Sequence, residues 1–109
     1  MTKGIKENWI RVLVKKPGEP IKEDLIENKL EAFQQIVGGY IQTVMITTTE
    51  NVVMICNEEG KLLGLPHNFY FAGDHIVGTV IFVSQKDDDF TGIRPKAAKY
   101  VYQRFDWRV

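Results

Sequence analysis

The sequence has little of what metal or disulfide chemistry requires. Cys56 is its only cysteine, which excludes an internal disulfide and a cysteine-based metal cluster within one chain. We expect this thiol to be a small buried hydrophobic group rather than a nucleophile. His67 and His75 are the only histidines, and no metal-ligand spacing involves them. The sequence therefore predicts neither a metal site nor a cofactor.

Long apolar runs are also absent. No segment approaches the roughly twenty apolar residues that a membrane-spanning helix needs, and the amino terminus has no signal-peptide-like stretch. We therefore expect a cytoplasmic protein without a membrane partner. Catalytic signatures are missing too, because the chain has one serine, Ser84, and no glycine-rich phosphate loop before a helix.

The sequence also lacks an excess of positive or of negative charge. Fourteen basic and fourteen acidic side chains cancel, whereas proteins that bind nucleic acid nonspecifically or imitate it usually carry a strong imbalance. We therefore expect no nucleic-acid partner. Basic residues crowd the carboxyl end, where we interpret them as the solvated face of a helix. They are Arg94, Lys96, Lys99, Arg104 and Arg108.

What the sequence does contain is enough for one small domain. Its 109 residues, 44% of them hydrophobic, can bury a single modest core. Residues 1–8 are polar and expected to be frayed, which leaves residues 9–109 as one α+β domain. There are no internal repeats and no low-complexity segments.

The first half of the chain alternates between strand and helix patterns. WIRVLVK, residues 9–15, alternates with the period of a half-buried strand, and residues 21–27 carry the charge of an edge strand. Asn28 and Glu31 resemble a capping box at the start of a helix, which Gly38 and Gly39 end. The apolar stripe of this helix is Leu30, Phe33, Ile36 and Val37.

The middle of the chain predicts a hairpin with a polar loop beyond it. Residues 40–47 and the apolar run 52–56 are strands joined by four polar residues, so they should pair antiparallel. Residues 57–60 form a turn, and the leucines of residues 61–65 are expected to close one end of the core. An aromatic cluster follows: Phe69, Tyr70 and Phe71.

The last third predicts a central strand and a terminal helix. Residues 74–83 end in IVGTVIFV, which is apolar on both faces, and Gly78 within it is expected to mark a bulge or a close approach of another backbone. The acidic run 87–89 lacks the glycine and alternation of a calcium loop and is interpreted as a solvated turn. The helix spans residues 95–105 with an apolar face of Ala98, Val101, Tyr102 and Phe105.

These segments combine into an α+β fold. We expect a mostly antiparallel sheet of four or five strands packed with two helices, in the order strand, strand, helix, three strands, helix. The strand within residues 74–83 should lie centrally, because only a strand covered on both sides reads as apolar on both faces.

Several segments together resemble a known family. IRVLVKKPGEP, LEAFQQIVGGYI, NVVMICNEEGKLLGLPHN, DHIVGTVIFV and DDDF resemble the domain-of-unknown-function family DUF3846, small proteins of bacteria, phages and mobile elements. The resemblance covers nearly all of residues 9–105, although the segment TGIRPKAAKYVYQRF is more basic and tyrosine-rich than is typical. It implies no activity, cofactor or site residue. It does imply an accessory role, such as counter-defence.

Our first functional hypothesis is a binding protein without turnover. Polar loops beyond the strand 52–56 provide donors and acceptors for a small nucleotide-like ligand, and the aromatic cluster could stack on a flat ring. The same residues could instead form ordinary turns and core. The candidate ligand-binding residues are Asn57, Glu58, Lys61, His67, Asn68 and Arg94.

Two alternatives remain open. A nucleotide-acting hydrolase would use His67 as general base, with Glu58 or Asp74 orienting it. A module that binds and blocks a host protein would use exposed aromatic anchors, for which Trp9, Trp107, Tyr100 and Tyr102 are candidates. Whatever the function, we expect a homodimer, because small antiparallel sheets often pair.

Overall fold

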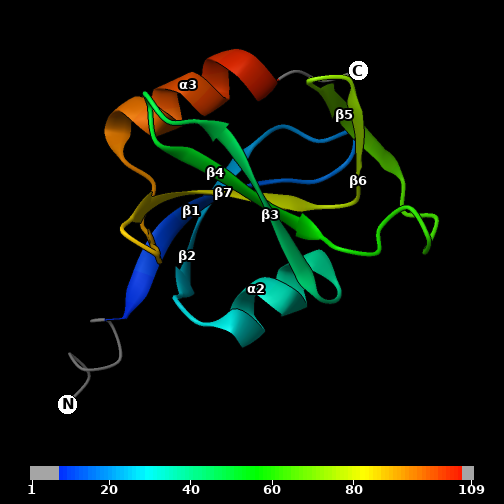
Figure 1. Cartoon of the computed structure of the whole chain (residues 1–109), viewed down its shortest axis with the longest axis horizontal. Coiled ribbons are helices and arrows are strands. Elements are labelled where there is room, and N and C mark those ends of the chain that lie inside the picture. Colours follow the sequence, from blue (N-terminus) through cyan, green and yellow to red (C-terminus); the bar gives the residue numbers. More distant parts are fainter. Residues whose placement is uncertain (1–7, 107–109) are drawn as a thin grey trace.

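A computed structural model describes residues 8–106; residues 1–7 of the segment expected to be frayed, and Trp107 and Arg108, lie outside this range. Within it, six strands form one antiparallel sheet in the order β2-β1-β7-β4-β3, with β8 paired to β7 (Figure 1). The expected α+β fold is confirmed. The strands are β1 (Trp9–Lys15), β2 (Lys22–Glu27), β3 (Ile41–Thr47), β4 (Val52–Asn57), β7 (Val80–Lys86) and β8 (Asp89–Thr91).

The sheet is covered on both faces by different elements. Helix α2 (Leu30–Val37) packs on one face, and helix α3 (Pro95–Phe105) covers the other together with an antiparallel ribbon of β5 (His67–Phe71) and β6 (Asp74–Val77) (Figure 1). Strand β7 lies in the middle of the sheet, as predicted. Its Ile81 and Val83 enter the core beneath α2, and Val80 and Phe82 enter the core beneath α3.

The core beneath α3 is built around aromatic rings. The Phe105 ring lies 4.9 Å from the ring of Phe69 and 5.1 Å from that of Phe82, centroid to centroid. The predicted bounds of α3 are confirmed. Its inward face differs from the prediction, because Ala97 is buried whereas Tyr102 is 39% exposed. A small residue at position 97 lets the helix approach the sheet closely.

The start of α2 differs from the predicted capping box. The residue at the cap position is Lys29, and no side chain among residues 8–106 caps the helix. The side-chain Nδ2 of Asn28 instead donates to the carbonyl of Phe90, at 2.9 Å, and so ties the start of the helix to β8. This long-range hydrogen bond takes the place of the local capping bond that the sequence predicted for Asn28. The predicted end is confirmed, because Gly38 adopts the left-handed conformation at φ 83°.

The expected long strand over residues 74–83 is two strands. Gly78 has φ +77° and interrupts the run, so that β6 leaves the sheet to pair with β5 while β7 enters it. The Gly78 amide donates to the Pro66 carbonyl at 2.7 Å, which fixes this crossing point. A left-handed residue costs little for glycine alone, and here it produces a change of sheet rather than a bulge.

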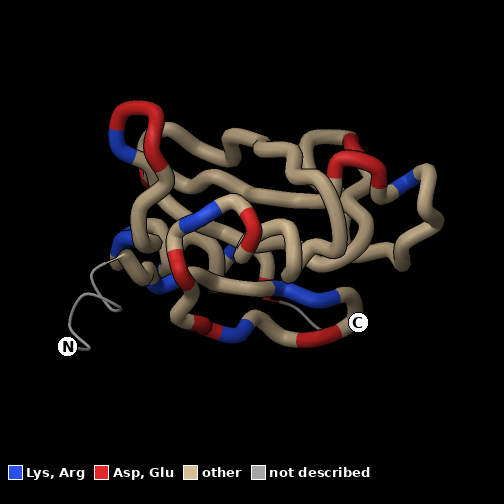
Figure 2. The backbone as a smooth tube through the Cα atoms, turned by 90° about the horizontal axis from the view of Figure 1, so that it is seen from below, with Lys and Arg blue, Asp and Glu red and all other residues tan. Residues whose placement is uncertain are grey.

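The leucines of residues 61–65 do not close the core. Leu62 is 86% exposed, and Leu63 is also exposed. The β5–β6 ribbon takes their place, since Phe69 and Ile76 are buried against the sheet. Charged residues of both signs lie near one another along the backbone and at the turns (Figure 2), in keeping with the balanced composition.

We expect Phe105→Ala to lower the free energy of unfolding by about 3 to 5 kcal/mol, because it removes a fully buried ring and leaves a cavity. Tyr102→Ala, on the exposed side of the same helix, is the matched control and should change stability far less. Urea denaturation followed by circular dichroism measures both. Equal losses in the two variants would show that α3 is not anchored through Phe105.

Candidate functional site

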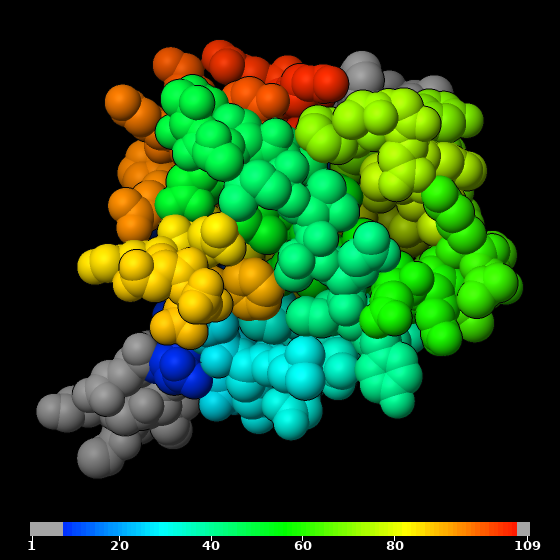
Figure 3. Space-filling model, viewed as in Figure 1, coloured from blue at the N-terminus to red at the C-terminus, as the bar shows by residue number. Residues whose placement is uncertain are grey.

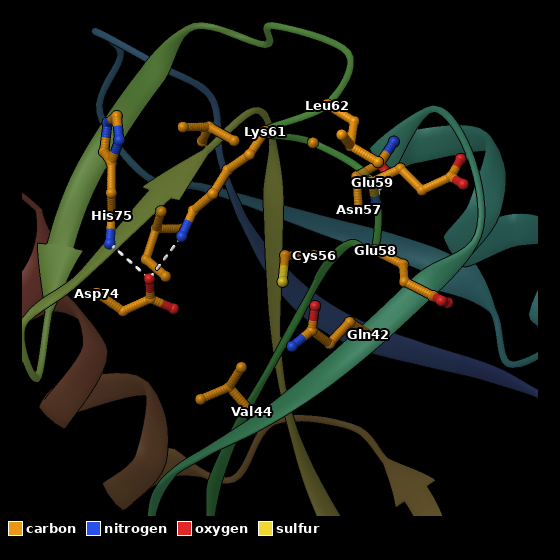
Figure 4. A pocket seen from close by; sticks show the side chains of 13 residues that line it. Gln42, Val44, Cys56, Asn57, Glu58, Glu59, Lys61, Leu62, Asp74 and His75 are labelled. Atoms are coloured by element: carbon orange, nitrogen blue, oxygen red, sulfur yellow. Dashed lines mark hydrogen bonds and ion pairs between the residues drawn. The ribbon is translucent and has the colours of Figure 1, made fainter.

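A cleft of about 190 Å³ opens between the end of β4 and strand β6. We call it the β4–β6 cleft. Gln42 and Val44 of β3 line one side, residues 56–62 form the back, and residues 74–77 of β6 form the opposite wall (Figure 4). The cleft thus lies where the fully buried strand β4 gives way to a polar turn.

The turn at the back of the cleft is fixed by Asn57. This residue is buried, and its Oδ1 accepts a hydrogen bond from the backbone amide of Glu59 at 2.7 Å. Its Nδ2 donates to the Val37 carbonyl at the end of α2, at 3.2 Å. The neighbouring amide of Glu58 donates to the Tyr40 carbonyl at 2.8 Å. Asn57 therefore has a structural role, holding the turn against α2.

Close packing places the same turn against β6. A Cβ atom at Gly60 would lie 2.9 Å from Cγ2 of Val77, and one at Gly78 would lie 2.8 Å from Cδ1 of Leu65. Both glycines let the backbone approach neighbouring side chains more closely than other residues allow. The back and the far wall of the cleft are thereby joined.

An ion pair lies at the mouth of the cleft. The Lys61 ammonium donates to Asp74 Oδ1 at 2.8 Å, and the backbone amide of His75 donates to the same oxygen at 2.8 Å (Figure 4). The Lys61 hydrogen bond, followed by that from His75, lowers the pKa of Asp74 below its ordinary value. Because both side chains are exposed, the pair contributes little to folding.

The floor of the cleft includes Cys56, which is buried as the sequence indicated. Burial, and to a smaller extent the negative charge of Asp74, raise the pKa of its thiol above the ordinary value. The thiol is therefore kept in its protonated form at neutral pH. That environment does not suit a nucleophilic cysteine, which needs a lowered pKa.

Two histidines and a tyrosine lie together on the ribbon beside the cleft. His67 Nδ1 and His75 Nε2 are 2.8 Å apart, so one ring donates to the other. The Tyr70 ring stacks on His75 at 5.0 Å. Only His75 of these three lines the cleft. Of the predicted aromatic cluster, Phe69 is in the core, Phe71 is partly buried and Tyr70 is exposed.

Two of the six candidate ligand-binding residues lie outside the β4–β6 cleft. Asn68 is buried and donates to the carbonyls of Lys15 and Gly78, at 3.0 and 2.8 Å, so it links β1 to the crossing after β6. Arg94 precedes α3 and lines a separate hollow with residues 48–51. The β4–β6 cleft is lined by Asn57, Glu58 and Lys61. His67 lies beside the cleft, where its ring is hydrogen-bonded to His75, which does line it.

Sequence reasoning did not assign Gln42 to the site. Gln42 pairs with Cys56 in the register of β3 and β4, and this pairing places its amide over the cleft. A shift of register between Met45 and Thr47 sets that pairing. Hairpin periodicity alone, counted from the turn, would place Thr43 opposite Cys56 instead.

The charge around the cleft is mainly negative. Glu58, Glu59 and Asp74 contribute three carboxylates, and Lys61 contributes one ammonium that is already paired. An uncharged or cationic ligand is favoured there over a phosphate group. Among residues 8–106, no group of three or more His, Cys, Asp and Glu side chains is arranged to hold a metal ion.

The fold and the cleft define a small α+β protein with a polar cleft beside its sheet. This chain belongs to the family described as Domain of unknown function (DUF3846), whose sequence profile matches residues 10–106 and confirms the resemblance. Neither the curated proteins nor the solved structures give a significant match. Within the described part of the chain, no helix is long and apolar enough to cross a membrane.

We expect Asn57→Ala to lower the free energy of unfolding by about 1 to 3 kcal/mol, since it leaves the Val37 carbonyl and the Glu59 amide without their partner. Glu58→Ala is the control, because that side chain is exposed. Chemical denaturation compares the two. A loss no larger than that of the control would mean that Asn57 does not hold the turn.

We expect Lys61→Met to raise the pKa of Asp74 toward its ordinary value, because the strongest cause of its lowering is removed. In the native protein the carboxylate stabilises the fold above the unfolded-state pKa, and this contribution is lost as the pH falls through the lowered folded-state pKa. The stability of the variant should therefore change less with pH in this range. NMR titration of the Asp74 carboxyl carbon measures the shift, with Lys86→Met as control.

Proposed function

We propose that this protein is a non-catalytic binding protein that holds a small ligand in the β4–β6 cleft. The observation that carries the proposal is the fixed turn at residues 57–60, which is bonded to the end of α2 and to Tyr40 just before β3 and is packed on β6. A turn held on three sides can present its polar groups to a ligand without ordering them first, and this lowers the entropic cost of binding.

The cleft favours a particular part of a nucleotide-like ligand. Its volume of about 190 Å³ is below the roughly 300 to 1,000 Å³ of sites that enclose drug-sized molecules. A single planar ring system suits this size. The amide of Gln42 and the ring of His75 supply hydrogen-bonding groups for its edge. Because carboxylates surround the opening, any phosphates would have to lie outside the cleft, toward solvent.

Binding without turnover is supported by the state of the polar groups. The ring of His67 is hydrogen-bonded to His75, and neither Glu58 nor Asp74 is bonded to it among the described residues. The raised pKa of the Cys56 thiol also disfavours covalent chemistry. The hydrolase hypothesis therefore gains no support from the arrangement.

The biological setting is part of the same proposal and is carried by the family resemblance. An accessory protein of phage or mobile-element type could withdraw a signalling nucleotide from a defence pathway by binding it, which would be counter-defence by sequestration. If phage-encoded, it would act in the host cytoplasm. We include a homodimer in this proposal.

A protein partner is the second candidate, and one observation favours it. Leu62 and Leu63 are exposed at the loop beside the cleft, and neighbouring exposed apolar side chains commonly mark interaction sites. A host protein docked there would cover the cleft rather than enter it. The same loop would then serve an inhibitor module.

To test the first candidate, we would titrate nucleosides and their phosphorylated forms into the 15N-labelled protein. We expect amide shifts within residues 56–62 and 74–77, and tighter binding of nucleosides than of the matching phosphates. Gln42→Ala should weaken binding about tenfold, corresponding to one hydrogen bond. Arg94→Ala, which lies at another hollow, should leave the affinity unchanged.

The ligand should be recovered intact after the protein is denatured, as chromatography will show. Products of hydrolysis would overturn the non-catalytic assignment. Absence of shifts across the panel, or shifts confined to residues far from the cleft, would overturn the ligand site. If Leu62→Ser with Leu63→Ser abolished binding to a host protein while the panel stayed silent, the second candidate would replace the first.

A further inference from the structure

The two edge strands of the sheet differ sharply in charge. Strand β2 reads KEDLIE and carries four charged side chains in six residues, whereas β3 reads IQTVMIT and carries none. Natural proteins protect sheet edges with charges or proline, because an unprotected edge pairs with other strands. Strand β2 is protected in this way. Strand β3 is not.

The outer edge of β3 has no partner in the described part of the chain. Strand β3 is the last strand in the sheet order, and its only ladder is with β4. Apart from that ladder, no hydrogen bond among residues 8–106 involves the backbone of residues 41–47. The strand has seven residues without glycine or proline, and five of them are β-branched. It runs across an exposed face of the molecule (Figure 3).

We propose that β3 pairs with β3 of a second copy of this chain, antiparallel, so that the two sheets become one continuous sheet. The absence of charge singles out a second copy as the occupant. In an antiparallel pair of identical strands, a charged residue near the two-fold axis lies close to its own counterpart, and such like charges destabilise the pair. A strand without charges meets no such repulsion, and β-branched residues pack well across strands.

Symmetry fixes which side chains meet. A two-fold axis relating two antiparallel edge strands lies perpendicular to the sheet, so a given residue points to the same face in both copies. Gln42 and Val44 line the β4–β6 cleft in one copy. Gln42 and Val44 of the second copy therefore lie on that same face, one strand spacing of about 4.8 Å farther out.

This arrangement enlarges the β4–β6 cleft. Strand β3 is the outermost strand beneath the cleft, and pairing extends the floor beyond it with side chains from the second copy. The extension rests on the proposed ligand site, whereas the pairing itself does not. A ring system held in the cleft would then have its outer part resting on the second copy.

The pairing is tested without any ligand, by sedimentation equilibrium and by hydrogen exchange. We expect twice the mass of the single chain, and slow exchange at alternate amides of β3 that becomes faster on dilution. Met45→Lys should weaken the dimer at least tenfold by placing a charge on the edge. Leu25→Lys is the matched control, because Leu25 is 47% exposed on β2 and Met45 is 42% exposed on β3.

A second variant, Thr43→Lys, places the charge one residue from the centre of β3 and should also give a monomer. Circular dichroism confirms that each variant is folded. A native protein that sediments as a monomer at NMR concentrations overturns the pairing, as does a Leu25→Lys variant that dissociates as readily as Met45→Lys. A monomer that nevertheless binds a foreign β-strand peptide along β3 also overturns it.

Ligand titration then separates the two proposals. A dimer that binds no member of the nucleoside panel supports the pairing and overturns the proposed function. If a nucleoside binds, we expect the monomeric Met45→Lys variant to bind it at least several-fold more weakly, because half of the extended floor is lost. Equal affinity in monomer and dimer overturns the enlargement of the cleft.

Discussion

The burial of β4 and β7 on both faces is the constraint on which the rest of this structure depends. Every residue of β4 is buried, and Val80 to Ser84 of β7 are buried as well. A sheet whose middle strands are apolar on both sides must have two covers. Helix α2 supplies one, but it is only eight residues long. The other requires both α3 and the β5–β6 ribbon.

The ribbon is what creates the candidate site. It leaves the sheet at Gly78 and lies over the face that α3 does not reach, so Phe69 and Ile76 complete the core there. Beyond these residues the ribbon and the polar turn after β4 face each other across the β4–β6 cleft. The cleft is therefore a consequence of covering a sheet with a ribbon that is too narrow to reach β3.

Strand β3, the uncharged edge of the sheet, contributes to both cores. Strand β3 carries Val44 and Ile46 against the core beneath α3 and Ile41 against the core beneath α2. Its exposed positions, Gln42, Thr43 and Met45, carry uncharged side chains. Strand β2 contributes Ile26 to one core, and its exposed positions carry lysine, glutamate and aspartate. Cleft and edge adjoin, because Gln42 belongs to both.

The sequence by itself determined the segments whose structure depends on neighbours along the chain. The alternation in residues 9–15, the apolar run after Asn51 and the helical spacing from Pro95 to Phe105 predicted β1, β4 and α3 correctly, because periodicity and turn residues act over a few positions. Tertiary structure decided the rest. Asn28 bonds to β8 rather than capping α2, Gly78 sends β6 out of the sheet, and a one-residue shift in β3 brings Gln42 rather than Thr43 over the cleft. Each of these depends on a contact between segments far apart in the sequence, and local patterns carry no information about such contacts.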